Sequence, residues 1–405
     1  MTSRRLRTAA AATAAATLLL TAGCSAGSSS GSENAATGEP IVVSALSGLS
    51  FFPEASKAAQ AVFEDYNAAG GLNGRPVQFN VIDDKTDPGT AATAAKEALG
   101  AGAIAMVGSA SLVDCAVNHR AYEDAGIVSI PAVGSAPECF TTPNFSPVNA
   151  GPFLDSFMSL SYGSEDLKFN KICAVITTEP ASAKPAVMQS IDAWKKATGK
   201  DLAYLDDSLT RGQSSYAANI SKLRSQDCDA VFINDVADAV VGFLGEAANQ
   251  GMNLPVLATT AVYSDQFAAT ANYQGDIYVP AEFAPYGGSD DASADWSKVM
   301  DEHKVEKTSF AQGGYLAAKY FINILESIKG EPTREAFTKA AESMKQSVNE
   351  PMAQDEWIFG KADAHHPNET VYPVKLAAGQ TAWTPLGPVL DGGKRGWVAT
   401  KAVKN

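Results

Sequence analysis

The sequence predicts an α/β protein made of two similar halves, each with a parallel sheet covered by helices. From Ile41 onward, short apolar segments alternate with helical patterns, which is the order of a βαβ series. The series is interrupted by the turn-forming residues 149–152 and then begins again. The chain has 405 residues, 45% of them apolar and 19% charged, which is enough for two domains with cores.

The first half is expected to contain four strands separated by three helices. The expected strands are 41–46, 77–82, 104–107 and 127–130. The expected helices are 53–68, 88–100 and 112–124.

The stretch NAAGGLNGRPVQFNVIDDKTDP, residues 67–88, shows how these boundaries are set. Gly70 and Gly71 can adopt the left-handed conformation that ends a helix, and Asn73-Gly74 supplies a turn before the next strand. Asp87 then offers an N-cap carboxylate, and Pro88 takes the first helical position, where a missing N–H costs nothing.

The second half repeats this alternation. Strands are expected at 171–177, 202–205, 230–234, 255–257 and 276–279, and helices at 183–198, 216–225, 237–250 and 264–270. Helical patterns follow at 292–305, 310–328 and 333–346, and the tail is strand-like at 356–359 and 371–375.

The N-terminal 23 residues resemble a lipoprotein signal peptide. Three arginines precede a short Ala/Leu-rich run, which ends in small residues before Cys24. Thr21 stands where such signals usually carry Leu, with Leu20 one place earlier. The resemblance implies cleavage before Cys24 and lipidation of its thiol, with residues 24–39 as a flexible tether rich in Ser, Gly and Ala. The alternative is an ordinary secretory signal with a chance cysteine.

Charge and motifs argue against several function classes. The formal charge is −14, and without the first 23 residues the chain has 28 bases against 45 acids, which disfavours nucleic acid and anionic lipid as partners. The Gly-rich GAGAIA at 100–105 precedes a strand instead of following one, and there is no Walker lysine motif or GxSxG. The four histidines stand in no metal-binding motif. We therefore expect no enzyme, no cofactor and no metal.

Four strings point to a family: NAAGGLNGRPV, DDKTDP, VGSAS and YEDAGI. They resemble the leucine/isoleucine/valine-binding family of type I solute-binding proteins, which serve branched-chain amino acid ABC transporters. The resemblance runs from Ile41 to the tail.

The resemblance implies two Rossmann-like lobes joined by a three-segment hinge, with the ligand between them. The hinge segments would fall near 149–153, 279–285 and 350–356. Lobe I would comprise 40–150 and 283–350, and lobe II would comprise 151–282 and 351–405.

The ligand is expected at the loops that follow the strands, because open α/β sheets bind ligands beyond the carboxyl ends of their strands. Serines of two loops are candidates for a carbonyl or anionic group, and two phenylalanines for an apolar wall. The candidates from the first half are Phe51, Phe52, Ser109, Ser111, Leu112, Gly134 and Ser135. The candidates from the second half are Glu179, Asp235 and Thr260.

Two positions depart from the family pattern. Leu112 aligns with the principal hydroxyl contact, and Thr260 aligns with the acid that holds the ligand's ammonium. The nearest acids in second-half loops are Glu179 and Asp235. The set of contacts that the family uses to bind an α-amino acid is thus incomplete. The ligand could therefore also be an amide, an aromatic acid or another small solute. The plain alternatives are that the serines cap helices and the phenylalanines belong to the core.

Cys115, Cys139, Cys173 and Cys228 remain after Cys24 and allow three pairings in an oxidising compartment. On the fold that the resemblance implies, Cys173 and Cys228 enter or precede neighbouring strands of a 2-1-3 sheet, while Cys115 and Cys139 follow successive strands. We expect the pairs 115–139 and 173–228; the alternative is buried free thiols.

The function expected from this resemblance is that of a monomeric extracytoplasmic lipoprotein, anchored to the outer face of the cell membrane at Cys24. It would capture a small polar solute, an amino acid or a relative, and deliver it to an ABC permease with separate ATPase subunits. A sensor receptor of the same fold and a hydrolase are the alternatives from other classes.

Overall fold

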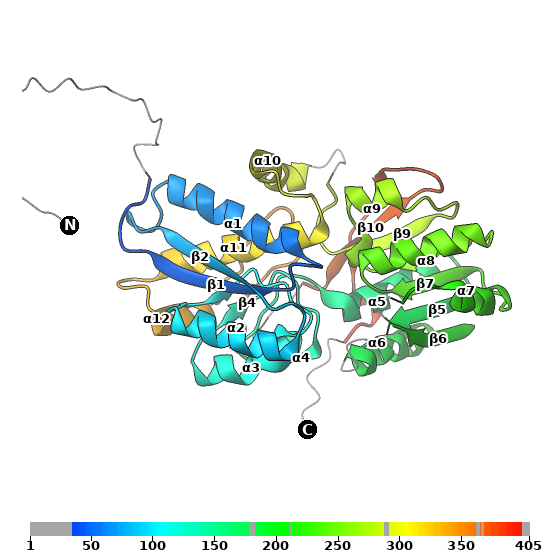
Figure 1. The fold of residues 1–405 in the computed structure, drawn as a ribbon, viewed down its shortest axis with the longest axis horizontal. Helices are drawn as coiled ribbons and strands as arrows, with labels where there is room; N and C mark the ends of the chain where they lie inside the picture. The colour runs from blue at the N-terminus through cyan, green and yellow to red at the C-terminus, as the bar shows by residue number, and fades with distance from the viewer. Residues whose placement is uncertain are drawn as a thin grey trace, which may run out of the picture. The chain divides into compact units, whose positions relative to one another are not determined.

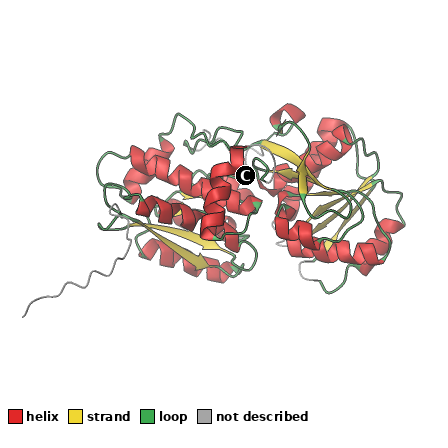
Figure 2. Cartoon of the chain, turned by 90° about the horizontal axis from the view of Figure 1, so that it is seen from above, coloured by secondary structure: helices red, strands yellow, loops and turns green. Residues whose placement is uncertain are grey.

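The strands of the protein form two sheets, seen in a computed structural model that describes residues 35–177, 183–210, 213–286, 291–361, 365 and 368–398. Cys24, the signal segment and most of the expected tether lie outside these residues. Figure 1 shows the two sheets with helices on their faces, and Figure 2 shows them from above.

The first sheet has the order β2-β1-β3-β4 and is parallel throughout the described residues. Its strands are β1 (Ile41–Ser47), β2 (Val77–Asp83), β3 (Met106–Val107) and β4 (Ser129–Ile130). The last two are shorter than expected, although the backbone hydrogen bond from Ile104 to Val42 continues the pairing before β3.

Helices cover both faces of this sheet (Figure 1). On one face lie α1 (Pro53–Ala68) and α11 (Ser309–Ser327), and on the other lie α2 (Pro88–Gly100) and α3 (Asp114–Asp124). The short helix α4 (Pro137–Thr141), which was not expected, follows β4. Two further helices are α10 (Ala294–His303) and α12 (Arg334–Glu342), the second ending four residues before the expected end.

The boundary signals of residues 67–88 act as predicted. Gly70, Gly71, Asn73 and Gly74 all have positive φ. The Asp87 side chain accepts a hydrogen bond from the Thr90 N–H at 2.7 Å, and α2 begins at Pro88. The backbone N–H groups of Thr37 and Gly38 donate to Gly74, so the residues just before β1 are held against this turn.

The second sheet has the order β11-β10-β9-β8-β7-β5-β6 in the described residues. Its parallel part comprises β5 (Ile172–Thr177), β6 (Tyr204–Leu209), β7 (Ala230–Asn234), β8 (Val256–Ala258) and β9 (Ile277–Ala281). The expected 2-1-3 order, with β5 between β6 and β7, is confirmed. The strand expected at 202–205 begins at Tyr204 and runs to Leu209.

The tail adds antiparallel strands to this sheet. β10 (Thr370–Leu376) pairs antiparallel with β9, and β11 (Trp383–Pro385) and β12 (Leu390–Asp391) pair antiparallel with β10. The strand expected at 356–359 is wrong, because only an isolated bridge joins Val348 to Trp357. Trp357 is instead buried in the core, where it stacks on Tyr320 with ring centroids 4.6 Å apart.

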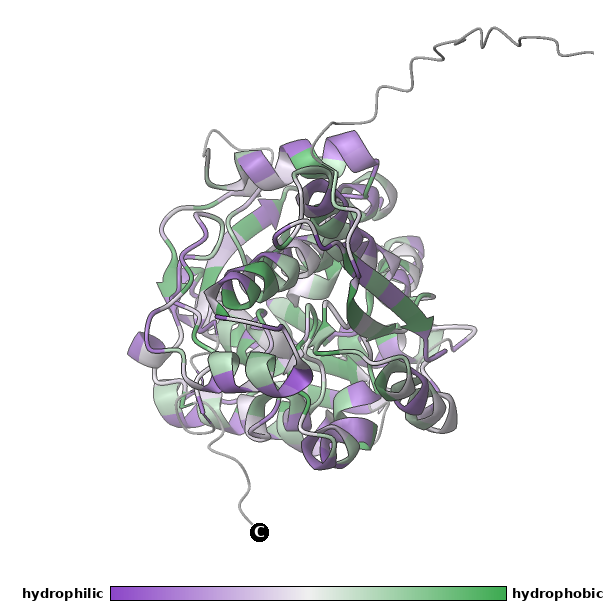
Figure 3. Ribbon diagram, turned by 90° about the vertical axis from the view of Figure 1, so that its left-hand side faces the viewer, coloured by the Kyte–Doolittle hydropathy of each residue, from purple (hydrophilic) through white to green (hydrophobic). Residues whose placement is uncertain are grey.

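The helices of the second sheet also lie on two faces. α5 (Gly151–Ser161) and α6 (Ala183–Thr198) pack on one face, and α7 (Ala217–Arg224), α8 (Ala237–Asn249) and α9 (Asp265–Thr270) pack on the other. Helix α5 was missed, although Phe153, Leu154, Phe157 and Met158 of its sequence GPFLDSFMSLS recur at helical spacing. The helix is buried on almost every side, its serines and Asp155 included. Figure 3 shows hydrophobic residues on the strands between the helices.

The chain passes three times between the elements of the two sheets: from β4 to α5, from β9 to α11, and from α12 to β10. The predicted hinge segments overlap these passages in part, with 151–153 in α5 and 279–281 in β9; the hinge positions and the lobe boundaries stay a prediction. Both expected disulfides, Cys115–Cys139 and Cys173–Cys228, are present.

Candidate ligand-binding site

A cavity of about 850 Å³, including space open to solvent, lies at the carboxyl ends of strands from both sheets. The loops after β1, β3 and β4 contribute Phe52, Leu112 and Ser135, and the loops after β7 and β8 contribute Asp235 and Thr260. The cavity therefore draws its wall from the loops that the sequence singled out in both halves.

The apolar part of the wall is aromatic. Phe52 is 3% exposed and meets Phe310 of α11 edge to face, with centroids 4.9 Å apart. Phe153 of α5, Val133 and Val187 extend this surface. Phe52 thus belongs to the core and also lines the cavity, so its two predicted roles, core residue and apolar wall of the site, are compatible.

Phe51 lies elsewhere. Together with Gln213, Tyr216 and residues of α8 it lines a neighbouring groove of about 1170 Å³. Its ring is 6.1 Å from that of Phe52. The structure therefore separates the two phenylalanines that the sequence analysis grouped.

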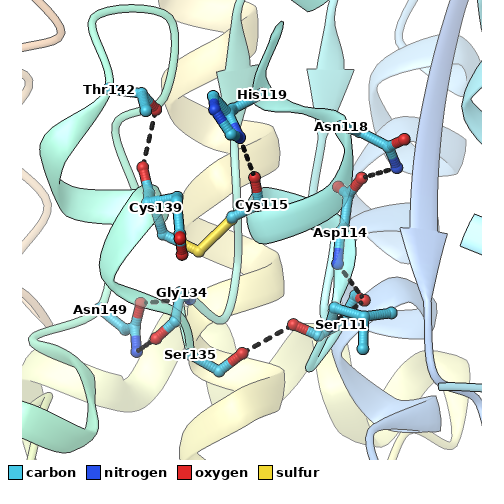
Figure 4. The surroundings of a disulfide bond; sticks show 12 residues. Ser111, Asp114, Cys115, Asn118, His119, Gly134, Ser135, Cys139, Thr142 and Asn149 are labelled. Carbon is cyan, nitrogen blue, oxygen red and sulfur yellow. Dashed lines mark hydrogen bonds between the residues drawn. A yellow bond between two sulfur atoms is a disulfide. The ribbon is translucent and has the colours of Figure 1, made fainter. Parts of the chain in front are cut away.

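The predicted serines divide into structural and cavity-lining residues (Figure 4). Ser111 Oγ accepts hydrogen bonds from the N–H groups of Val113 and Asp114 at 3.0 and 2.9 Å, so it caps the start of α3. Ser109 Oγ accepts from the Leu46 N–H at 3.1 Å and ties its loop to β1. Ser135, which lines the cavity, donates to the Ser111 carbonyl at 2.7 Å.

Gly134 holds the loop behind Ser135 in place and is absent from the cavity wall among the described residues. Its N–H donates to Asn149 Oδ1 at 2.7 Å, and Asn149 Nδ2 donates back to its carbonyl (Figure 4). A Cβ at position 134 would lie 2.9 Å from Phe140 and Pro147, so only glycine fits without movement. Asn149 itself lines the cavity.

The Cys115–Cys139 disulfide fastens this region from behind. It links the first turn of α3, next to Asp114, to α4, which follows the Ser135 loop (Figure 4). The two loops that carry Leu112 and Ser135 are therefore joined covalently as well as through the Ser135–Ser111 hydrogen bond.

Two of the three second-half candidates lie on the wall. Asp235 is 6% exposed and follows β7. Thr260 donates its hydroxyl to Ser309 Oγ at 2.9 Å. Glu179 lies outside the described residues, although Thr177, just before that segment, lines the cavity.

Two buried acids that the sequence analysis missed also line the cavity. Asp155 of α5 accepts the Thr260 N–H through Oδ2 at 3.0 Å. Glu282, the residue after β9, accepts the Gly151 N–H at 2.7 Å and Asn149 Nδ2 at 3.1 Å, both through Oε1. The other carboxyl oxygens, Asp155 Oδ1 and Glu282 Oε2, are buried and have no hydrogen-bond partner in the described part of the chain.

Burial governs the protonation of this pair. It raises the pKa of Asp155 well above its ordinary value, and the nearby charge of Glu282 raises it further. Burial also raises the pKa of Glu282 to about 7, against the opposing effect of the Gly151 N–H and the Asn149 amide. The cavity therefore contains acids that hold a proton more readily than ordinary carboxylates do.

A sequence signal for these acids existed. Asp155 is the one charged residue within the apolar run GPFLDSFMSLS, and Glu282 directly follows the buried strand IYVPA. Charged side chains are rarely fully buried without a reason, so an acid in an apolar run next to an expected hinge segment marks a candidate site.

Other kinds of site are not found in the described residues. No group of three or more His, Cys, Asp or Glu side chains there is arranged to hold a metal ion. Within the same residues, no helix has the length and apolar character needed to cross a membrane.

Comparisons with known proteins agree with this architecture. A family model described as periplasmic binding protein matches residues 42–381. The amino acid binding protein of Pseudomonas aeruginosa is 24% identical over 348 residues, which cover 85% of this chain and 83% of that protein. The Leu/Ile/Val-binding protein of Escherichia coli is 24% identical over 237 residues, covering 56% of this chain and 64% of that protein.

Solved structures with the same fold bind different molecules. The branched-chain amino acid transporter substrate binding protein LivJ of Streptococcus pneumoniae, in complex with isoleucine, superposes with a TM-score of 0.73 at 16% identity, over 86% of this chain and all of that one. A fatty acid ABC transporter substrate-binding protein of Thermomonospora curvata gives 0.74 at 18% identity, over 91% and 97% of the two chains. The family match over most of the chain, together with this fold, shows that the protein belongs to the periplasmic binding proteins, as a type I solute-binding transport component and not an enzyme.

Proposed function

We propose that this protein is the extracytoplasmic substrate-binding lipoprotein of an ABC importer, which captures a small polar solute, an amino acid or a related compound, and delivers it to a permease. The observation that carries the proposal is the cavity lined by loops of both sheets. A ligand in such a cavity touches both groups of elements at once, so binding favours the arrangement in which they are closed around it. The permease then recognises the closed form.

The relatives support the amino acid class without fixing it. One relative is named for amino acids and another for leucine, isoleucine and valine, but a solved structure that is 18% identical, with a TM-score of 0.74, is named for fatty acids. In this chain Leu112 and Thr260 occupy the cavity wall at the two positions that depart from the branched-chain pattern. An amide or an aromatic acid thus remains the alternative ligand to a branched-chain amino acid.

The lipid anchor is proposed from the sequence of the first 24 residues. Their arginines, their Ala/Leu run and Cys24 fit a lipoprotein signal. A sensor receptor is the second candidate function, since the same closure can report occupancy to a signalling partner; permease genes beside this gene would favour the importer.

A ligand screen tests the proposal. Purified protein is heated with amino acids, amides, aromatic acids and fatty acids in turn, because a ligand that binds only the native state raises Tm by mass action. A reproducible rise with one solute class, together with loss of uptake of that solute in cells without the gene, supports the importer. If no solute of any class shifts Tm or binds by calorimetry, the proposal fails.

A further inference from the structure

The charge of the cavity wall discriminates between ligand classes. Among the described residues that line the cavity are three acids, Asp155, Asp235 and Glu282, and no Lys, Arg or His. These acids come from three elements: α5, the loop after β7 and the end of β9. A ligand whose only charge is a carboxylate would therefore find no cationic side chain on the described part of this wall to pair with.

Asp155 and Glu282 are placed for a ligand more specifically than Asp235. They are 0% and 1% exposed, and each uses one oxygen to bind the protein, through Thr260 in one case and Gly151 in the other. Each then has a second oxygen with no partner in the described residues, as has Thr177 Oγ1 on the same wall. Leaving such buried groups unpaired is unfavourable, and more so when they are charged, so a ligand donor that pairs with them stabilises the complex.

We propose that Asp155 and Glu282 form the subsite that binds a protonated amine of the ligand, whose N–H groups donate to Asp155 Oδ1 and Glu282 Oε2. The inference rests on the proposed function and narrows the ligand to an amine-bearing solute with an apolar body. The aromatic surface of Phe52, Phe153 and Phe310 takes the apolar body. The subsite replaces the acid that is missing at Thr260, because the Thr260 N–H itself holds Asp155 in place.

A proton leaves the site when the amine enters. Without ligand, the pair retains a proton in the neutral pH range, since burial raises the pKa of Glu282 to about 7 and of Asp155 above its ordinary value. Asp235 is the third titratable group on the described wall. A bound ammonium stabilises both carboxylates in their charged form, so the proton passes to the buffer and amine affinity rises as the pH increases toward 7.

The experiment compares probes that share a body and differ in their head group. The first set is 2-phenylethylamine, 3-phenylpropanoate and 3-phenylpropanamide; the second is 3-methylbutylamine, 4-methylpentanoate and 4-methylpentanamide; leucine and phenylalanine complete the series. Binding to the purified full-length protein is measured by calorimetry at pH 7 in two buffers of different ionisation enthalpy. The enthalpy difference between the buffers gives the number of protons released.

Three variants locate the subsite. Asp155→Asn and Glu282→Gln keep an acceptor oxygen for Thr260 and Gly151 but place an NH₂ group where the unpaired oxygen was. The matched control is Glu54→Gln, which changes another buried carboxyl that accepts from Thr308 at 3.1 Å and lies outside the described cavity wall. We expect amine-bearing probes to bind the wild type with proton release, to bind each subsite variant at least 10-fold more weakly and without that release, and to bind Glu54→Gln within twofold of the wild type.

The other outcomes overturn the inference. It fails if the carboxylate or amide probes bind as tightly as the amines, if no amine-bearing probe binds, or if the subsite variants leave amine affinity and proton release unchanged. A carboxylate or amide ligand found in this way leaves the proposed function intact, whereas the absence of any ligand in the wider screen overturns both. Circular dichroism of each variant separates a lost subsite from a lost fold.

Discussion

Individual hydroxyl groups divide between binding and structure in this protein, and sequence alone could not separate them. Ser111 and Ser135 both lie in loops that follow strands, which is why both were candidates. The Ser111 hydroxyl accepts a hydrogen bond at the start of α3, whereas Ser135 lies on the cavity wall. The difference depends on which way each loop turns, and that is set by tertiary contacts such as the Gly134–Asn149 pair.

Replacing Ser111 by Ala should lower stability and leave the cavity wall in place. Loss of the hydroxyl that accepts from the Val113 and Asp114 N–H groups before α3 is expected to reduce the free energy of unfolding by about 1 kcal/mol. Urea unfolding measures it, with the exposed Ser225→Ala as a control that should change little. Equal stability of Ser111→Ala and the wild type would contradict the capping role.

The Asp155–Glu282 pair should make stability fall as pH rises. Because the folded pKa of Glu282, about 7, exceeds its ordinary value of 4.5, the folded state binds more protons than the unfolded chain between these values. Stability attributable to this residue is therefore greatest below pH 4.5 and declines by up to about 3 kcal/mol toward pH 7.

The measurement is the difference between Glu282→Gln and the wild type, since buried acids outside the Asp155–Glu282 pair affect both proteins alike. Without ligand, the free energy of unfolding of Glu282→Gln should increase relative to that of the wild type as the pH is raised from 4.5 to 7.5. The exposed Glu165→Gln serves as the control, and its difference from the wild type should stay flat. A flat difference for Glu282→Gln as well would show that Glu282 is not held protonated in the folded state.

Elements were predicted well where local signals agree and poorly where tertiary contacts decide. Helices α1, α2 and α6 and strand β7 have the expected bounds, because caps, prolines and apolar periodicity coincide there. Helix α5 was missed, and the strand expected at 356–359 was wrong, since both segments are buried among other elements and contacts far along the chain decide their structure. The missed site residue Asp155 lies on that missed helix, so the two failures have one cause.

The contact between α1 and α11 gives a test at the scale of elements. A Cβ on Gly314 would lie 1.9 Å from the Ala55 carbonyl oxygen, so Gly314→Ala must push the helices apart. Overpacking of this kind costs roughly 1–3 kcal/mol, measured as a lower urea midpoint. Gly245→Ala on α8 is the matched control, because nothing lies within 4 Å of a Cβ there and the change should be neutral or stabilising by about 1 kcal/mol. The same loss in both variants would mean that helix contact is not the cause.

The two-sheet architecture could be predicted for the whole molecule because the βαβ alternation restarts after residue 150. Its antiparallel completion by β10, β11 and β12 could not, since strand direction at an edge depends on how the tail returns. The identity of the ligand is harder to predict from sequence, because the described residues of the cavity wall come from ten separate segments of the chain.

The proposed anchor is tested on the whole molecule in its host. Cys24→Ala removes the thiol that would receive lipid, so the protein should move from the membrane fraction to the soluble fraction. Immunoblots of the two fractions measure this, and Cys24→Ala should bind ligand in solution as the wild type does. Retention in the membrane fraction would show that the protein is held there by something other than a lipid on Cys24.

Glu282 also joins two of the three passages between the sheets, since it follows β9 and accepts from Asn149 and Gly151 beside the first passage. The same side chain thus belongs to the proposed amine subsite and to the contacts between two of the passages. If the protein is adapted as a fluorescent biosensor, a substitution of Glu282 that changes ligand preference will also remove its hydrogen bonds to Asn149 and Gly151. Such a substitution is therefore expected to change the equilibrium between open and closed forms as well as specificity. A redesign of ligand preference should therefore change the aromatic surface first and keep the Glu282 carboxylate.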